Sequence, residues 1–307
     1  MKICIIAVNK DDYAPSRFFA EGEKRGHNMY LTTWSDLVFQ MDKKGLSIGD
    51  GVREISDFDV IIPRSPNFTL RVRNKKITGR FGTLLRLIIE YANNKRIFVL
   101  NSRFFGSYQS LDKLAQQFFL MQNKLPGLDS YFFASREAQK NQKVLRFPFV
   151  AKNTNGSLGL GVYKITSTEE LWHCMKKSYY NKNNLLFQKY YKIKHDYRVL
   201  VVGSKPLGVM MRSASGKEWR TNVHLGGTAG HAPKAEEAAL AVLAKKTVRK
   251  MHLDYAGIDI LKDSSVFRVI EINSLAQFKG FEKLFPETNV AREVIKLAEK
   301  EVRKLKK

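Results

Sequence analysis

The sequence predicts an α/β protein with a small parallel α/β domain at the N-terminus, followed by segments that mix helices with antiparallel strands. Up to about residue 105, apolar runs of strand length alternate with helical patterns, which is typical of a parallel sheet. Further along, two pairs of strand-like runs are each separated by a short polar turn, as in antiparallel hairpins. Apolar residues make up 44% of the 307 positions, which is enough to form a core.

The N-terminal region supports this fold class element by element. Helices are expected at 16–25 and 79–92, and the second carries closely spaced apolar residues such as Leu85 and Ile88. Buried strands are expected at 1–8, 29–32, 58–63 and 97–101. We therefore expect a first domain over residues 1–105. No G-x-G-x-x-G follows its first strand, so a dinucleotide-binding fingerprint is absent.

The remaining elements follow in chain order. A helix over 110–123, with Ser110 as its N-cap, has apolar residues at helical spacing. Strands at 147–153 and 161–165 flank a glycine-rich turn. The other expected elements are a helix at 168–177, a strand at 185–191, hairpins at 197–202 with 206–212 and 255–261 with 266–273, and helices at 236–251 and 289–307.

Charge and cysteine content narrow the function classes. The 53 Lys and Arg against 29 Asp and Glu give a net charge of +24, which fits either a generally basic surface or a polyanionic partner. The two cysteines, Cys4 and Cys174, are too few for a disulfide framework and are expected to be buried free thiols. No apolar run is long enough for a membrane span, and the N-terminal apolar stretch ends too early for a signal peptide. We expect a cytoplasmic protein.

The glycine-rich turn is the first candidate site. It follows Lys152 at the end of a strand, and its glycines would let backbone N–H groups approach a phosphate closely. The residues that would form it are Gly156, Ser157, Gly159 and Gly161. Because the turn returns into a strand rather than opening a helix, it is neither a P-loop nor a Rossmann loop. An ordinary hairpin with flexible glycines is the alternative.

Three polar side chains on the last hairpin form a candidate metal site. Glu271 and Asn273 are two residues apart on one strand, so they share a face, and Asp259 lies nearly opposite on the partner strand. Oxygen ligands of this kind suit Mg²⁺ together with phosphate oxygens. The alternative is a solvated polar face, which the apolar neighbours of these residues disfavour.

Two further groups are less specific. Arg212, Arg220 and Asn222 could clamp a phosphoryl group or complete a phosphate shell, although a basic surface loop explains them equally well. Gln188, Lys189 and Tyr190 on a strand, followed by Asp196, could contact an adenine and a ribose. A plain edge strand is the alternative there.

In this order the motifs resemble the ATP-grasp superfamily, in particular its RimK-type branch of alpha-L-glutamate ligase-like enzymes. The phrases that carry the resemblance are HDYRVLVVG, WRTNVHLGG, YAGIDIL and VIEIN, within residues 101–282. The resemblance implies an α+β ATP-grasp fold in which two α+β subdomains, at 106–187 and 188–307, clasp ATP and follow the N-terminal domain. It also implies a homo-oligomer.

The family's chemistry implies roles for these residues. ATP phosphorylates a substrate carboxylate to an acyl phosphate, and an amine then displaces phosphate to form an amide. Lys113 and Lys152 would hold the ATP phosphates beneath the glycine loop, and Arg220 and Arg212 would stabilise the phosphoryl charge. The remaining roles are adenine contacts by Gln188, Lys189 and Tyr190, ribose binding by Asp196, a phosphate-shell contact by Asn222, and Mg²⁺ (or Mn²⁺) binding by Asp259, Glu271 and Asn273.

The chain departs from the family pattern at three places. Residues 274–278 read SLAQF where relatives have a small residue followed by Ser-Pro-Gly, and Leu225 stands where the branch often has Arg. Lys189 stands where Glu is common, which matters little if only its backbone contacts adenine. The first two departures lie where substrate groups would bind, so the identity of the added amino acid stays open, with glutamate favoured.

The sequence leaves two other functions open. One is a nucleic-acid-binding α/β protein, suggested by the charge of +24 and by aromatics among lysines at 179–195, although no known nucleic-acid motif is present. The other is an ATP-grasp scaffold that binds nucleotide without ligating. For a ligase, the basic surface favours an acidic peptide or protein tail as the carboxylate-bearing acceptor, and a small acceptor such as a glutamylated cofactor stays open.

Overall fold

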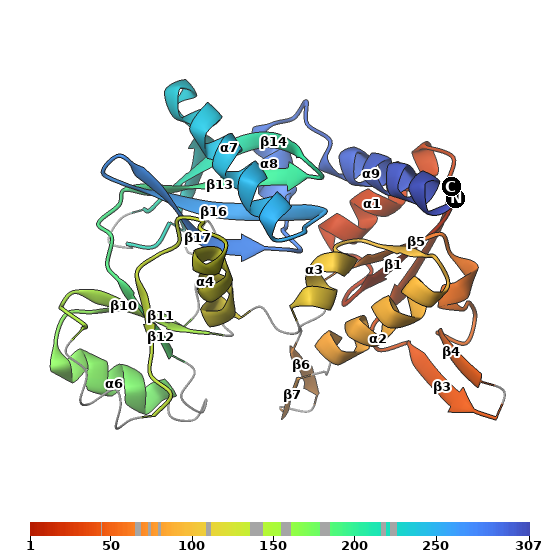
Figure 1. Cartoon of the computed structure of the whole chain (residues 1–307), viewed down its shortest axis with the longest axis horizontal. Coiled ribbons are helices and arrows are strands. Elements are labelled where there is room, and N and C mark those ends of the chain that lie inside the picture. The colour runs from red at the N-terminus through yellow and green to blue at the C-terminus, as the bar shows by residue number, and fades with distance from the viewer. Residues whose placement is uncertain are drawn as a thin grey trace.

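Three main sheets organise the chain in the computed structural model (Figure 1). The structure describes residues 1–43, 45–64, 69–72, 75–78, 81–108, 112–135, 144–154, 161–178, 185–215, 219–221 and 226–307. Helices and strands are mixed throughout, so the predicted α/β class with α+β segments is confirmed.

The N-terminal sheet is parallel, as the alternation of strands and helices predicted. Its strands run in the order β2-β1-β5-β8. They are β1 (Lys2–Ala7), β2 (Asn28–Thr33), β5 (Val60–Pro63) and β8 (Phe98–Val99), and the helices that follow them are α1 (Tyr13–Lys24), α2 (Phe81–Asn94) and α3 (Ser102–Ser107). Successive residues of a strand face opposite sides. Ile3 and Ile5 therefore join a core with α1, whereas Cys4 and Ile6 join a second core with α2.

Small elements around this sheet were not predicted. Two antiparallel hairpins, β3 (Val38–Asp42) with β4 (Gly45–Gly49) and β6 (Thr69–Val72) with β7 (Lys75–Thr78), and a short 3₁₀ helix η1 (Ile55–Asp57) follow the early strands. The β3–β4 hairpin is largely exposed, so it lacks the alternation of apolar and polar residues that marks a half-buried strand.

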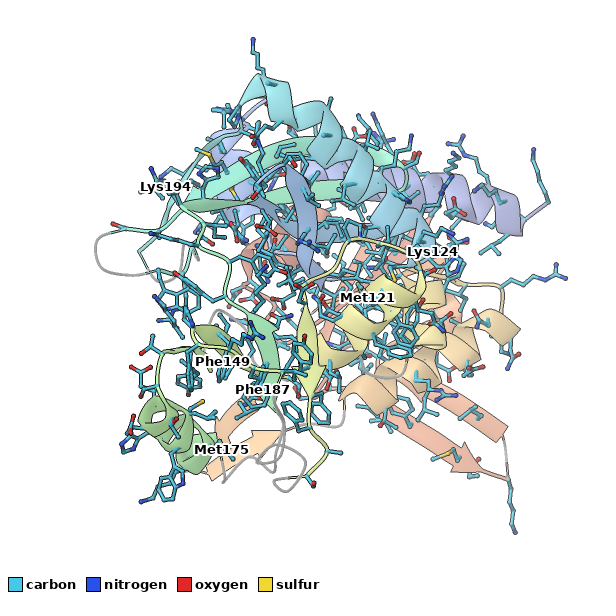
Figure 2. All side chains as sticks on the ribbon, turned by 60° about the vertical axis from the view of Figure 1, so that its left-hand side comes forward. Met121, Lys124, Phe149, Met175, Phe187 and Lys194 are labelled. Carbon is cyan, nitrogen blue, oxygen red and sulfur yellow. The ribbon has the colours of Figure 1, made fainter. Side chains whose placement is uncertain are left out.

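The central sheet is antiparallel and contains the two strands that flank the glycine-rich segment in the sequence. Its strand order is β11-β10-β12-β9, with β9 at Ser130–Phe132, β10 at Phe149–Asn153, β11 at Val162–Ile165 and β12 at Leu185–Lys189. Figure 2 shows Phe149 and Phe187 on neighbouring strands with Met175 of α6 (Thr168–Ser178) below them, and these side chains share one core. The predicted domain boundary after residue 187 falls inside β12.

The C-terminal sheet contains both predicted hairpins. Its order is β15-β14-β13-β16-β17. The strands are β13 (His195–Val202), β14 (Lys205–Ser213), β15 (Thr228–His231), β16 (Tyr255–Asp263) and β17 (Val266–Asn273). Helix α7 (Lys234–Lys250) covers one face. Helix α4 (Lys113–Gln122) lies beside β17, where Gln117 donates to the Ile270 carbonyl at 2.8 Å and Gln116 accepts from the Ile272 N–H at 2.8 Å.

The N-cap of α4 differs from the prediction. Asp112 is the N-cap, and its side chain accepts from the Ala115 N–H at 2.9 Å. The predicted cap, Ser110, lies outside the described residues. Both residue types cap helices well, so composition alone does not choose between positions two apart.

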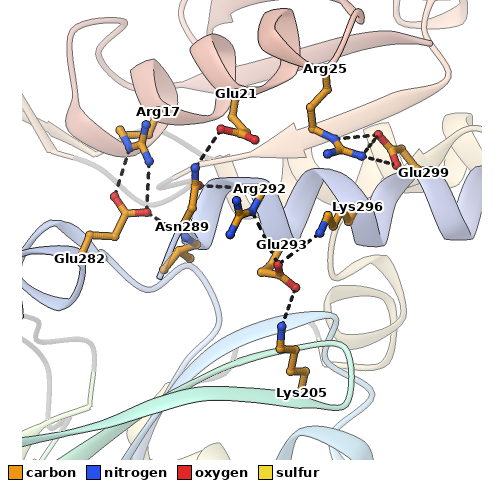
Figure 3. Close-up of polar contacts among 11 residues, drawn as sticks. Arg17, Glu21, Arg25, Lys205, Glu282, Asn289, Arg292, Glu293, Lys296 and Glu299 are labelled. Atoms are coloured by element: carbon orange, nitrogen blue, oxygen red, sulfur yellow. Dashed lines mark hydrogen bonds and ion pairs between the residues drawn. The ribbon is translucent and has the colours of Figure 1, made fainter. Parts of the chain in front are cut away.

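The last helix returns to the first domain. After α8 (Lys279–Leu284), helix α9 (Val290–Leu305) starts one residue after the predicted start, and the predicted first residue, Asn289, is its side-chain cap. It packs against α1, and both chain termini lie beside the N-terminal sheet (Figure 1). Figure 3 shows the polar contacts that join α9 and α1: Glu299 binds Arg25 through two contacts of 2.9 Å, and Asn289 donates to Glu21 at 2.9 Å.

Two expectations from composition can be compared with the structure. Cys4 and Cys174 are both buried free thiols, as predicted. Among the described residues, the helices are all too short or too polar to cross a bilayer.

The Glu299 contacts predict a pH-dependent contribution to stability. Burial by itself would raise the pKa of Glu299, but hydrogen bonds from His27 and Arg25 outweigh it and lower the pKa below its ordinary 4.5. A carboxylate with a lowered pKa stabilises the fold above its unfolded pKa, and this contribution is lost as the pH falls through the folded value. Glu299→Gln should therefore lower the free energy of unfolding at pH 7 by about 1–2 kcal/mol.

Urea unfolding at several pH values checks this. The difference between the wild type and Glu299→Gln should shrink as the pH falls below 4.5. Glu301→Gln is the matched control, because among the described residues Glu301 forms an ion pair with Lys304 alone, on the same helix, at 2.6 Å. An equal effect of the two substitutions would contradict the prediction.

Candidate active site

The register of the C-terminal sheet brings acidic and basic side chains together on one face. Asp259 lies directly opposite Glu271 in the β16–β17 pair, as predicted from the hairpin. On the other side of β16, Arg198 of β13 pairs with Asp259. Asp196, two residues earlier in β13, pairs with Arg212 of β14. Since residues two apart on a strand share a face, these groups form one layer across four neighbouring strands.

Asp259 is the centre of this layer. Arg198 donates from Nε and Nη2 to its two carboxylate oxygens, each at 2.8 Å. Arg212 Nη2 lies 3.1 Å from Asp259 Oδ2, and Arg212 also binds Asp196 through two contacts of 2.7 and 2.6 Å. The Asn273 amide donates to Asp259 Oδ2 at 3.2 Å. The side chains of Asp196, Arg212 and Asp259 are all buried.

The charges in this layer stabilise one another. Burial by itself would raise the pKa of Asp259, but Arg198 and Arg212 outweigh it and hold the pKa well below its ordinary value. Burial would likewise lower the pKa of Arg212, but Asp259 and Asp196 raise it. Arg212 and Asp259 therefore stay ionised in a place from which water is largely excluded.

Two lysines reach the layer from other elements. Lys113, the first residue of α4, has its Nζ 3.4 Å from Glu271 Oε1, and its backbone N–H donates to the Thr154 carbonyl after β10 at 3.1 Å. Lys152 on β10 is half-buried, and burial lowers its pKa to about 8. The charges of Glu271, Lys113, Asp196 and Asp259 also act on its pKa, so Lys152 belongs to the same group.

The predicted adenine residues lie at the end of β12. Gln188 is buried and donates to Ser130 Oγ at 2.8 Å, and its Oε1 has no hydrogen-bond partner among the described residues. The Lys189 N–H already donates to the Asp129 carbonyl at 3.0 Å. A backbone contact to adenine would therefore use other backbone atoms of Lys189 and Tyr190. The Tyr190 ring lies 4.4 Å from the Lys164 ammonium.

Arg220 comes directly after Trp219, which contacts Tyr190 at the end of β12. The Trp219 ring packs edge-on against Tyr190 with centroids 5.9 Å apart, so the described stretch 219–221 begins next to the end of β12. Asn222 lies outside the described residues, as do Gly156, Ser157 and Gly159 of the glycine-rich turn.

Gly161, at the end of the same turn, is described. Its backbone has φ of +71°, and its carbonyl accepts from the Asn153 N–H at 2.8 Å. A Cβ at this position would lie 3.1 Å from the Asn153 Cβ. Glycine is therefore required here both by conformation and by the close approach of the two strands.

Arg198 is the site residue that the sequence analysis missed. It makes two of the contacts to Asp259, yet only its neighbour Asp196 was singled out. The signal was present in the phrase HDYRVLVVG, because a residue two positions after Asp196 on a strand must share its face.

The donor set fits a hard divalent cation. Asp259, Glu271 and Asn273 supply two carboxylates and one amide from adjacent positions, and oxygen ligands of this kind suit Mg²⁺. The Asp259 oxygens are engaged by the arginines, so a cation would have to replace at least one of those contacts. The surrounding Lys113, Lys152, Arg198 and Arg212 suit phosphate oxygens.

Two surface hollows lie away from this layer. One, of about 700 Å³, is lined by residues such as Lys2, Asp59 and Lys306 near the chain termini. The other, of about 460 Å³, lies between α1 and β2. Neither is lined by a predicted site residue, so the chemistry of the charged layer, rather than the size of a hollow, identifies the candidate site.

The comparisons with known proteins agree with this arrangement. Residues 107–298 match the family model described as a RimK-like ATP-grasp domain, and residues 1–74 match the RimK PreATP-grasp domain. A probable alpha-L-glutamate ligase from Vibrio atlanticus (strain LGP32) is 30% identical over 92% of this chain and 90% of that protein. Probable alpha-L-glutamate ligase 2 from Shewanella sp. (strain W3-18-1) is 28% identical over 100% of this chain and 98% of that protein.

A solved structure shares the fold. The ATP-grasp ligase PsnB, complexed with minimal precursor, Mg and ADP, superposes with a TM-score of 0.70 at 15% identity. The match covers 98% of this chain and 97% of that one.

The ion pairs predict different stability effects at two neighbouring carboxylates. Asp259→Asn should lower the free energy of unfolding by about 3 kcal/mol, because it removes a buried charge that two arginines need. Glu271→Gln should cost less than about 1 kcal/mol, because the Glu271 side chain is 30% exposed and forms one ion pair with the residues that the structure describes. Urea unfolding of both variants measures the difference, and equal costs would show that Asp259 is not the centre of the layer.

Proposed function

This chain belongs to the RimK-like ATP-grasp family of ligases, and from that membership we propose that it joins glutamate or another amino acid to a carboxylate-bearing acceptor. ATP would convert the acceptor carboxylate to an acyl phosphate, and the amine of the amino acid would displace phosphate to form an amide. The observation that carries the proposal is the layer in which Asp259, Glu271 and Asn273 lie among Lys113, Lys152, Arg198 and Arg212.

The chain's own residues suit each requirement of this reaction. Lys113 and Lys152 would hold phosphate groups, and the glycine-rich turn, of which residues 155–160 lie outside the described part of the chain, would close over them. Arg198 and Arg212, with Arg220 from the neighbouring loop, would stabilise the charge that develops on the transferring phosphoryl group. Asp259, Glu271 and Asn273 would hold Mg²⁺, which when bound neutralises charge on the phosphate oxygens. No covalent protein nucleophile is required.

Asp196 has a clear structural role beside its proposed one. Both of its carboxylate oxygens accept from Arg212, so the pair fixes the orientation of that guanidinium. A ribose hydroxyl bound by Asp196 would have to share those oxygens. Gln188, Lys189 and Tyr190 remain the proposed adenine contacts, and Gln188 Oε1, which has no hydrogen-bond partner in the described part of the chain, would be an additional acceptor.

The relatives support the substrate classes. Two relatives are named probable alpha-L-glutamate ligases, and PsnB was solved with a precursor, Mg and ADP. We therefore propose ATP and Mg²⁺ as requirements, glutamate as the favoured amino acid, and an acidic peptide or protein tail as the acceptor. Use of Mn²⁺, a homo-oligomeric state and a cytoplasmic location stay predictions.

Amino-acid-dependent ATP turnover tests the proposal. The full chain is incubated with ATP, Mg²⁺ and each amino acid in turn, with and without acidic peptides, while phosphate release is measured and products are identified by mass spectrometry. Glutamate should raise phosphate release, and Glu271→Ala should abolish the increase by removing a metal ligand. Glu287→Ala, an exposed carboxylate outside the layer, is the matched control.

Two outcomes would count against the ligase. If no amino acid or peptide raises phosphate release, the chain is a nucleotide-binding scaffold or has another function. If Glu271→Ala keeps the amino-acid-dependent release, the metal assignment is wrong.

Lys152 predicts how nucleotide binding depends on pH. Its pKa of about 8 means that it loses its proton as the pH rises past 8, whereas bound phosphate favours the protonated form. The dissociation constant for ADP should therefore rise by up to about 10-fold between pH 7 and pH 9. Isothermal titration in buffers of different ionisation enthalpy should show proton uptake at pH 8–9. Lys152→Arg should flatten the profile, and identical profiles would exclude Lys152 from the phosphate site.

A further inference from the structure

Arg64 is an enclosed arginine at the carboxyl end of a parallel strand. It follows β5 directly, and only 1% of its surface is exposed. Its Nη2 donates to the carbonyls of Leu275 and Ala276, each at 3.1 Å. Its Cζ lies 5.7 Å from the centre of the Phe18 ring. The guanidinium thus lies between the N-terminal sheet and the segment that follows β17.

The positive charge of Arg64 is not neutralised within the described residues. Its Nε and Nη1 are buried and have no hydrogen-bond partner there, and no described carboxylate is within ion-pair distance. Burial lowers the pKa of Arg64, which Tyr255 and Asp12 oppose only in part, but a guanidinium keeps its proton in proteins. The two arginines of the candidate site differ in this respect, because Arg198 and Arg212 each bind a carboxylate.

A buried charge without a counter-ion destabilises a fold, so its presence calls for a ligand or another functional reason. Arg64 provides N–H donors only, and a guanidinium pairs best with a carboxylate or a phosphate. Since the side chain is almost fully enclosed, its partner must be a small group, and the carboxylate of a free amino acid is such a group.

The position of Arg64 connects it to the candidate site. The segment that it holds, 274–276, starts immediately after Asn273, a proposed metal ligand. Tyr255 at the start of β16 donates to the same Ala276 carbonyl at 2.7 Å, and Asn101 after β8 donates to the Ser274 carbonyl at 2.6 Å. In open α/β sheets, ligands bind at the carboxyl ends of the strands, where both Arg64 and Asn101 lie.

We infer that Arg64 binds a carboxylate of the incoming amino acid, one that takes no part in bond formation. This inference rests on the proposed ligase function and assigns its amino-acid subsite. The subsite lies at the edge of the N-terminal sheet, between β5 and residues 274–276. In this subsite the Arg64 guanidinium pairs with the unreacted carboxylate of the amino acid while the amine of that amino acid reacts at the phosphoryl site.

Kinetics of Arg64→Met test the inference. The KM for L-glutamate, measured by phosphate release with ATP and Mg²⁺, should rise about 10- to 100-fold when a charge-assisted contact is lost. The dissociation constant for ADP should stay unchanged. The melting temperature should change little, because the removal of an uncompensated buried charge offsets the loss of the two contacts to the Leu275 and Ala276 carbonyls. Arg103→Met, at a side chain 69% exposed, is the matched control and should leave the KM unchanged.

Substrate analogues identify which carboxylate is bound. L-glutamine lacks the side-chain carboxylate, and L-glutamate α-amide lacks the α-carboxylate. If Arg64→Met loses affinity for glutamate and glutamine equally but not for the α-amide, Arg64 binds the α-carboxylate. If it loses affinity for glutamate and the α-amide but not for glutamine, Arg64 binds the side chain. An unchanged KM for all three, together with a large fall in melting temperature, would show a purely structural clamp and overturn the inference.

A second variant and a binding measurement keep the test decisive. Arg64→Lys retains the positive charge and should give a KM between those of the wild type and Arg64→Met. If Arg64→Met does not fold, the test rests on Arg64→Lys alone. A KM of Arg64→Lys equal to that of the wild type then overturns the inference.

Failure of the ligase proposal is recognised separately, as an absence of amino-acid-dependent phosphate release in the wild type. In that case L-glutamate and glutarate, added with ADP and Mg²⁺, should still raise the melting temperature of the wild type. The increase should be smaller for Arg64→Lys. No shift in the wild type, or equal shifts in both proteins, overturns the subsite.

Discussion

The buried ion pairs around Asp259 connect the three neighbouring strands β14, β13 and β16 and set the positions of the candidate catalytic groups. Arg198 and Arg212 approach one carboxylate from β13 and β14, and Arg212 continues to Asp196. Removing such charges from water is costly, and the cost is met only because the register places acids opposite bases. The result is a set of ionised groups already oriented before any ligand arrives, which is the condition for electrostatic catalysis.

The same hairpin also anchors the N-terminal sheet. Asn101, fully buried, accepts from the N–H groups of Asp254 and Tyr255 and donates to the carbonyls of Tyr255 and Ser274. Arg64 holds the next two carbonyls of that segment. The carboxyl edge of the parallel sheet is thereby joined to the strand that ends in Asn273. Helix α9 strengthens the connection, because its contacts with α1 link the end of the chain to its beginning.

Features with a local signal were predicted from the sequence. Alternating apolar residues defined the hairpin, and a period of two then placed Glu271 beside Asn273 and across from Asp259. Asn289 was recognisable as a helix start because a cap is a contact within a few residues. The same locality explains the misplaced cap of α4, where Ser110 and Asp112 offer equivalent chemistry. The exposed β3–β4 hairpin had no periodic signal and was missed.

By itself, therefore, the sequence determined the fold class, the parallel first sheet and the position of Asp259 opposite Glu271. The metal site and the phosphate-binding lysines that it also indicated stay predictions. The tertiary structure alone decided that Arg198 binds Asp259, that Asp196 orients Arg212, and that Arg64 lies enclosed beside residues 274–276. The physical reason is the distance along the chain. Arg198 and Asp259 are 61 residues apart, and Arg64 and Leu275 are 211 apart. Such contacts depend on how the sheets pack against one another. The periodicity of apolar residues within a single helix or strand does not encode that packing.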